Sequence, residues 1–240
     1  MPGLDPFLPA LTQPAYYCVN CGFWQRYFEP PPSCPLCLDA RHVVPSDGWE
    51  FLDVATATRR YPCHWSELEP GIWKFWNDPV EGIGAAGYLV QTDAGNFMFD
   101  STAVYDDAAI DRIESLGGVA VLAGSHPHAY GALWQIQDRF EPELALHPGD
   151  FEWSAALRIT WSFDDEVEVL PGIRLFCTGG HFEGHTVAMI DRAKILMCGG
   201  CRARQTSCDG TVMCSSLWIS FKLGRRLNRR LMRGGTRRSR

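Results

Sequence analysis

The stretch Val119-Ala-Val-Leu-Ala-Gly-Ser-His126-Pro-His128-Ala-Tyr-Gly131 joins a short apolar run to two histidines one residue apart. The apolar run at 119–123 predicts a buried strand. The period-two spacing then places both imidazoles on one side of the backbone as it leaves that strand. Neutral imidazole is the commonest metal ligand among side chains, and three protein ligands with one open position are typical of catalytic zinc. The stretch therefore predicts that His126 and His128 bind a metal at a strand end.

A second histidine segment, Gly179-Gly-His181-Phe-Glu-Gly-His185-Thr186, offers candidates to complete this site. The glycines beside His181 allow close approach of the backbone, which suits a third ligand. His185 is open to three interpretations: a fourth ligand, a hydrogen-bond partner of a ligand, or a loop residue.

The cysteines predict a separate metal site near the N-terminus. Cys18-Val-Asn-Cys21 and Cys34-Pro-Leu-Cys37 are two Cys-x-x-Cys turns separated by twelve residues. Such a pair brings four thiolates around one tetrahedral zinc, which is closed to substrates and therefore structural. The loop at 22–33 carries only Arg26 as a basic residue, which argues against nucleic-acid binding by this segment.

Composition and charge set further limits on function. The chain has 240 residues, of which 46% are hydrophobic and 12% aromatic, as expected of a globular protein. It shows no signal-peptide pattern and no apolar run long enough to span a bilayer, so we expect a cytoplasmic protein without disulfides. Charge is uneven, with 11 basic and 27 acidic residues at 1–200, but 11 basic and one acidic at 201–240.

The pattern of apolar residues and turns predicts strands that alternate with helices. The histidines all follow strand ends, which favours a layered α+β sandwich with its site along one edge. Helices are expected at 49–62, 106–116 and 132–140, and strands at 71–76, 87–92, 97–100, 119–123, 143–147, 173–178, 186–190 and 194–198.

The order of these motifs resembles the metallo-β-lactamase fold over residues 70–200. Tyr88-Leu-Val-Gln-Thr-Asp-Ala-Gly-Asn-Phe-Met-Phe-Asp100 looks like its early hairpin, and His126-Pro-His128 like the first half of its His-x-His-x-Asp-His motif. Cys34-Pro-Leu-Cys-Leu-Asp-Ala-Arg41 and Leu146-His-Pro-Gly-Asp150 resemble a group of such proteins with an N-terminal cysteine segment. The resemblance implies a four-layer αββα sandwich, incomplete at the C-terminus and preceded by a small zinc ribbon. It also implies that His126, His128 and His181 hold the metal.

Two departures from that fold's motifs predict a single metal ion. Tyr130-Gly131 replaces the usual Asp-His pair, and Gly199-Gly200 lacks the aspartate that normally follows the late strand. One zinc or iron ion is therefore expected at the histidines. Asp150 and Glu183 are the candidates for a general base, and Tyr130 for a group that stabilises an oxyanion.

These features divide the chain into an N-terminal segment 1–48 with the ribbon at 17–41, a metallo-β-lactamase-like domain at 49–200, and a basic tail at 201–240. The tail is interpreted either as a disordered arm that binds nucleic acid or anionic membranes, or as the product of a reading frame altered near Gly200. The leading functional hypothesis is a metallohydrolase acting on a small molecule. The alternatives are a catalytically inactive zinc-binding protein and a nucleic-acid-associated ribbon protein.

Overall fold

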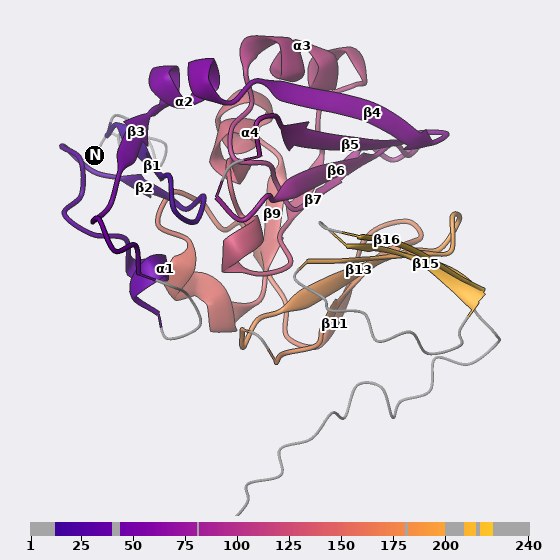
Figure 1. Ribbon diagram of the computed structural model, residues 1–240. Helices are drawn as coiled ribbons and strands as arrows, with labels where there is room; N and C mark the ends of the chain where they lie inside the picture. The colour runs from indigo at the N-terminus through magenta and orange to yellow at the C-terminus, as the bar shows by residue number, and fades with distance from the viewer. Residues whose placement is uncertain are drawn as a thin grey trace, which may run out of the picture.

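Two large β-sheets face each other in the computed structural model (Figure 1). It describes residues 13–39, 44–80, 82–180 and 182–199 in full, and the strands 209–214 and 217–222 by their backbone. The first sheet has the order β10-β9-β8-β7-β6-β5-β4, parallel from β7 to β10 and antiparallel from β4 to β7. Its strands are β4 Cys63–Glu69, β5 Ile72–Asn77, β6 Ala86–Val90, β7 Phe97–Phe99, β8 Val121–Ala123, β9 Glu143–Leu146 and β10 Trp161–Ser162.

The second sheet has six strands in sequence order, from β11 to β16. All neighbours are antiparallel except β14 and β15, which run parallel. Its strands are β11 Glu166–Leu170, β12 Ile173–Cys177, β13 Thr186–Ile190, β14 Ile195–Cys198, β15 Asp209–Cys214 and β16 Leu217–Lys222.

Alternating side chains of the central strands fill two different cores. In β7, Phe97 and Phe99 pack between the sheets, whereas Met98 points to the opposite side. This alternation follows from the two-residue period of a strand. Because both faces of the strand are covered, all three residues are buried.

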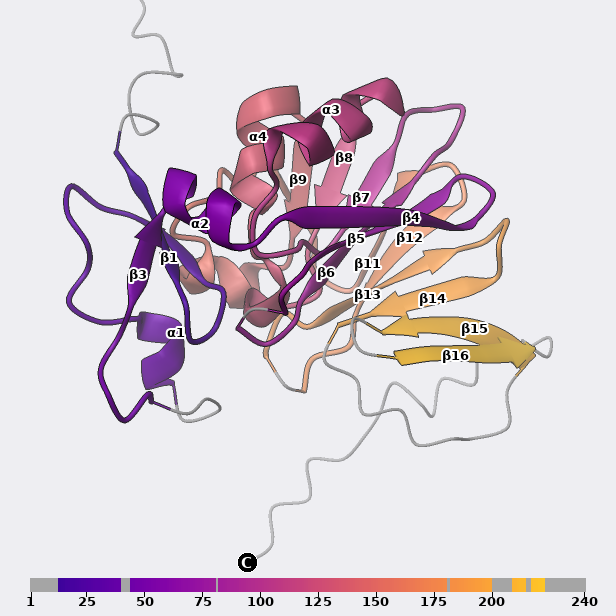
Figure 2. The same ribbon diagram turned by 45° about the horizontal axis from the view of Figure 1, so that its top comes forward.

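Two helices cover the outer face of the seven-stranded sheet (Figure 2). Helix α3 spans Asp107–Ser115 and is capped by Asp106, whose carboxylate accepts the Ala109 N–H. Helix α4 spans Leu133–Phe140. The described residues thus supply one helix layer and both sheets of the expected αββα sandwich.

The N-terminal segment forms a third, small sheet beside the sandwich. Strands β1 Ala15–Cys18, β2 Trp24–Arg26 and β3 Phe51–Asp53 pair in the order β2-β1-β3, and α1 Pro35–Leu38 carries the second cysteine pair. Tyr17 and Trp24 belong to the same core cluster as residues of α3 and α4, and Trp24 Nε1 donates to the Ala103 carbonyl at 2.6 Å. The ribbon is therefore continuous with the main core.

The prediction of a single helix at 49–62 is wrong for the first residues of that range. Residues 51–53 form β3, and the helix α2 spans only Val54–Arg60, with Asp53 as its N-cap. Residues 51–53 form a strand because Leu52 pairs with Tyr17 of β1 and is buried there. The local pattern of apolar residues does not reveal a contact between residues so far apart in the chain.

Sequence periodicity also did not predict β15 and β16, which lie within the segment expected to be a tail. Both extend the second sheet beyond β14. The remaining arginine-rich residues of 201–240 lie outside the described residues. The boundaries 1–48, 49–200 and 201–240 stay predictions.

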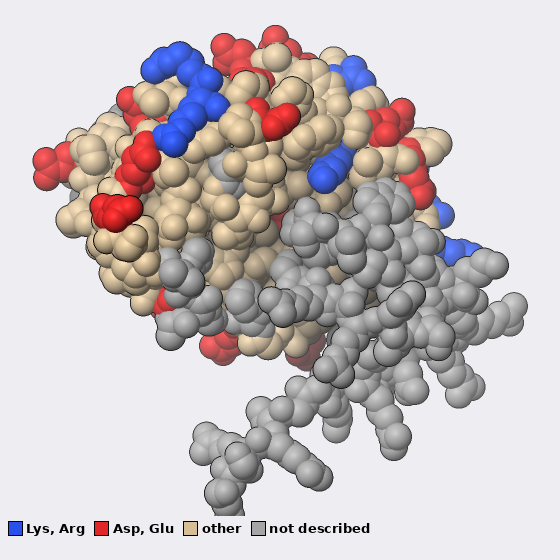
Figure 3. Space-filling view, in the orientation of Figure 1, with Lys and Arg blue, Asp and Glu red and all other residues tan. Residues whose placement is uncertain are grey.

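The described surface has no dominant charge on the face shown in Figure 3, where acidic and basic side chains are interspersed around a broad uncharged area. No helix among the described residues is long and apolar enough to cross a membrane.

Candidate metal centres

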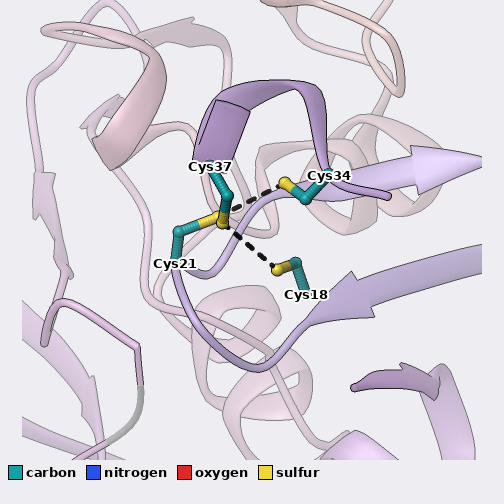
Figure 4. A group of neighbouring side chains, drawn as sticks. All are labelled: Cys18, Cys21, Cys34 and Cys37. Atoms are coloured by element: carbon teal, nitrogen blue, oxygen red, sulfur yellow. Dashed lines mark hydrogen bonds between the residues drawn. The ribbon is translucent and has the colours of Figure 1, made fainter. Parts of the chain in front are cut away.

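The four predicted cysteine ligands converge between β1 and α1 (Figure 4). Cys18 ends β1, and Cys21 lies on the turn that follows, where Gly22 adopts a φ of 85°; Cys34 is the N-cap of α1, and Cys37 lies within it. All four side chains are fully buried, and their sulfur atoms lie within 4.8 Å of one another. This proximity confirms that the two Cys-x-x-Cys turns form one cluster.

The distances within this cluster suit a tetrahedral metal. The Cys18 and Cys37 sulfurs lie 3.7 Å apart, and those of Cys21 and Cys34 lie 3.6 Å apart. Four thiolates at about 2.3 Å from a central zinc would be separated by about 3.8 Å. Hydrogen bonds from the Cys18, Cys21 and Cys34 thiols lower the pKa of Cys37, so the cluster favours a thiolate at that position. The donor set and spacing fit a structural zinc ion.

His126 and His128 lie where the sequence places them, just beyond the end of β8. Both are buried, at 3% and 9% exposure, and their ring centroids are 5.3 Å apart. Pro127 begins a short 3-10 turn, η2 Pro127–Ala129, which turns the chain immediately after His126. The two imidazole rings therefore lie next to each other, nearly perpendicular, just beyond the end of β8.

A buried carboxylate and a hydroxyl orient His126 from behind. Asp100 accepts the Ser125 backbone N–H, and its other oxygen accepts the Ser125 hydroxyl at 2.9 Å. The Ser125 oxygen lies 2.8 Å from His126 Nδ1, which leaves Nε2 as the nitrogen that would bind a metal. The sequence did not single out Ser125 as part of this site.

His185 is held by protein partners at both of its ring nitrogens. Nδ1 lies 2.7 Å from the Thr178 hydroxyl, and Nε2 lies 2.9 Å from the Gly199 carbonyl. A carbonyl oxygen can only accept, so Nε2 donates to Gly199. Of the three interpretations of His185, this arrangement favours a supporting role next to His126, whose ring centroid is 5.3 Å away.

The loop between β12 and β13 brings an aromatic ring to the histidines. Phe182 is 1% exposed, and its ring centroid lies 5.8 Å from that of His126 and 5.1 Å from that of His128. His181, the predicted third ligand, precedes it and lies outside the described residues. No sequence signal distinguished Phe182 from an ordinary apolar loop residue.

Asp150 and Tyr130, two of the catalytic candidates, form a buried pair. The Tyr130 hydroxyl lies 3.4 Å from one Asp150 oxygen, and the other accepts the Gly184 N–H at 2.9 Å. Burial raises the pKa of both groups, and the Asp150 carboxylate raises that of Tyr130 further. Glu183 is exposed beside them, packed over Gly149. The pair is thus placed to hold loops together, and Glu183 to meet solvent.

Two other described histidines, His147 and His64, have partners of their own. His147 accepts the Gly149 N–H, and His64 stacks on Trp76 in β4 and β5. Among the described His, Cys, Asp and Glu side chains, the four cysteines are the only group of three or more whose metal-binding atoms all lie within 4.8 Å of one another.

Comparison with known proteins supports the fold. No model of a known protein family matches the chain. Superposition on the solved structure of TMB-1 gives a TM-score of 0.53 at 17% identity, covering 66% of this chain and 92% of that one. The DIM-1 metallo-β-lactamase exposed to ceftazidime gives 0.50 at 14% identity, with 64% and 88% coverage. The chain has the metallo-β-lactamase fold.

One sequence relative of this metallo-β-lactamase-fold chain is the uncharacterized protein YmaE of Bacillus subtilis (strain 168). It is 29% identical over 179 residues, which are 72% of this chain. The chain spans 65% of the length of that relative.

The packing of the loop explains why position 131 carries no side chain. Gly131 has a φ of 39°, and a Cβ atom there would clash with the Thr102 carbonyl oxygen. A histidine at this place in the metallo-β-lactamase motif would therefore require the backbone to move. The packing around this loop therefore favours glycine at position 131, where the motif has a histidine.

Proposed function

We propose that the chain is a metal-dependent hydrolase that holds one zinc or iron ion on His126, His128 and His181 and a structural zinc on its four cysteines. The observation that carries the proposal is the buried pair His126 and His128 at a strand end of the metallo-β-lactamase fold, with His126 oriented by Ser125 and, through it, Asp100. A ligand imidazole held from behind by a polar group is typical of metal sites. The donors thus fit a metal that prefers imidazole.

A zinc or iron ion at these histidines would supply a Lewis acid and would lower the pKa of a water molecule to about 7. The residues of the chain orient the ligands, hold the surrounding loops and accept protons. Ser125 fixes the ring of His126, and the Asp150–Tyr130 pair holds the loop that carries Gly184. Glu183, which is exposed, is the candidate to take up a proton from the attacking water.

Metal content of the purified full chain tests this proposal. We expect about two equivalents of zinc plus iron, which fall to about one in a His126→Ala/His128→Ala double variant. The matched control is His64→Ala, which removes an exposed histidine of β4 and should leave both equivalents. One equivalent that the double variant leaves unchanged would contradict the hydrolase and favour the inactive zinc-binding protein.

Substrate class is tested on the metal-loaded chain with simple esters, thioesters, lactams and phosphodiesters, because the fold hosts many chemistries. Hydrolysis that His126→Ala/His128→Ala abolishes supports a small-molecule hydrolase. We propose the cytoplasm as its location, from the free thiols of the described cysteines.

Nucleic-acid binding is the second candidate, favoured by the excess of arginine at 201–240. The loop at 22–33 offers little to it, because its one basic residue, Arg26, forms an ion pair with Asp138 at 2.8 Å and lies over the Trp134 ring. Binding of RNA or DNA that weakens steeply with salt would support this candidate, and salt-independent failure to bind would contradict it.

A further inference from the structure

Phe182 belongs to two parts of the molecule at once. Its ring contacts both His126 and His128. It is also a member of the buried cluster that contains all four cysteines, together with Phe23 and Leu36. Trp153 completes the connection, since its ring lies 5.9 Å from Phe182 and packs against the same cluster. The core of the ribbon therefore extends to the histidine site.

The loop that carries Phe182 is fixed at its base by hydrogen bonds. The Thr178 and Gly179 N–H groups donate to the His185 carbonyl, and the Gly184 N–H donates to Asp150. Gly179 and Gly180 both have positive φ values, of 58° and 100°, so the backbone turns sharply just before residue 181. Towards the tip of this loop, Phe182 is the fully buried side chain that anchors the chain.

We propose that Phe182 is a positioning residue through which the four-cysteine cluster sets the geometry of the histidine site. This inference rests on the proposed metal at the histidines. A metal on the cysteines fixes the distance between β1 and α1, and hence the walls of the pocket that receives Phe182. Phe182 in turn fixes the orientation of the two imidazoles that it contacts. Emptying the cysteine cluster therefore loosens the histidine site.

The first test compares metal affinity at the two sites in the full chain. In Phe182→Ala, the histidine-site affinity for Zn²⁺ should fall by about tenfold or more, the range expected for groups that support metal ligands, while the cysteine site keeps its metal. Phe182→Leu, which retains most of the apolar volume, should fall less. The matched control is Phe75→Ala, which removes an equally buried ring from the core cluster that includes residues of α3 and α4 and does not include Phe182 or the four cysteines.

The second test needs no metal at the histidines. Hydrogen–deuterium exchange of the amides of residues 178, 179, 184 and 185 should accelerate in Phe182→Ala and also in a Cys34→Ser/Cys37→Ser variant. Combining the substitutions should add little, because both remove the same support. The Phe75→Ala control should not accelerate these amides selectively.

Unchanged exchange and affinity in both Phe182 variants would overturn the proposal, as would an equal response to Phe75→Ala. If the wild-type chain binds metal only at the cysteines, the proposed hydrolase fails, and the exchange measurement still decides the coupling. If the cysteine variant does not fold, the two Phe182 variants decide it alone.

Discussion

Ser125 connects a buried carboxylate to one of the two described histidines of the candidate metal site. It links the buried Asp100 carboxylate to His126 Nδ1 through its hydroxyl. Asp100 has a φ of 59°, in the left-handed region that non-glycine residues rarely adopt. Such a conformation costs on the order of 1 kcal/mol and persists only where the surroundings enforce it. The two hydrogen bonds that Asp100 accepts from Ser125 help to stabilise this backbone conformation.

Replacing Ser125 by alanine should therefore weaken metal binding at the histidines by about tenfold, because the ring of His126 loses its support. Competition of the loaded chain with a chelator measures this affinity. Ser154→Ala, which removes an exposed hydroxyl that caps a turn, is the control and should have no effect. An affinity within about twofold of wild type would contradict this role of Ser125.

Asp150 should give the protein a pH-dependent stability. Burial raises its pKa in the folded state, so the folded protein retains a proton that the unfolded chain releases. The stabilisation by the protonated form is complete below the unfolded pKa of about 4 and is lost as pH rises through the higher folded pKa. Wild type should therefore lose stability relative to Asp150→Asn over this range.

Urea unfolding at a series of pH values checks this expectation. The Asp150→Asn substitution removes the titrating carboxyl group, but the amide oxygen that it introduces can still accept the Gly184 N–H. Asp111→Asn, which changes an exposed carboxylate of α3, is the control. A difference between wild type and Asp150→Asn that does not vary with pH would contradict the burial effect.

At the scale of elements, Asp106 connects helix α3 to the edge of the first sheet. One of its carboxylate oxygens caps the helix, and the other accepts the Cys63 N–H at the start of β4 at 3.0 Å. Asp106→Ala should lower the free energy of unfolding by about 1–3 kcal/mol, since it removes a cap and leaves the Cys63 donor without its acceptor.

Asp106→Asn should lower the free energy of unfolding less than Asp106→Ala does. The amide oxygen keeps the cap, whereas the amide nitrogen cannot accept from Cys63. Asp107→Ala, one residue along and exposed, is the control and should change stability by only a few tenths of a kcal/mol. Equal losses in all three variants would contradict a specific role for Asp106.

The sequence was sufficient for elements whose signals are local. Asp106 and the glycines at 117–118 bracket α3, and the apolar run before the histidines forms β8. It was insufficient for β3 and β4, which depend on pairing with distant strands. At the site, spacing identified the cysteines and the histidine pair. Contacts between residues far apart in the chain, such as those of Phe182 with the ribbon, have no local signature.

At the scale of the whole molecule, the ribbon shares its core with the main domain. Tyr17 and Trp24 of the ribbon pack in one cluster with Ile113 and Leu133 of the helix layer. Trp24 also packs edge-on against Trp134 of α4, with ring centroids 5.2 Å apart. Domains that share a core unfold together, so loss of the ribbon metal should affect the entire chain.

Removing the cysteine-bound metal with a strong chelator should therefore lower the midpoint of a single cooperative thermal transition, without creating a separate early one. Far-ultraviolet circular dichroism follows the sheets, and tryptophan fluorescence follows the shared core, so coincident curves would establish cooperativity. Cys63→Ala removes a buried thiol outside the cluster and should leave the response to the chelator unchanged. An early fluorescence transition with intact sheets would show instead that the ribbon unfolds alone, because the contacts of Tyr17 and Trp24 would then be too weak to couple it to the sandwich.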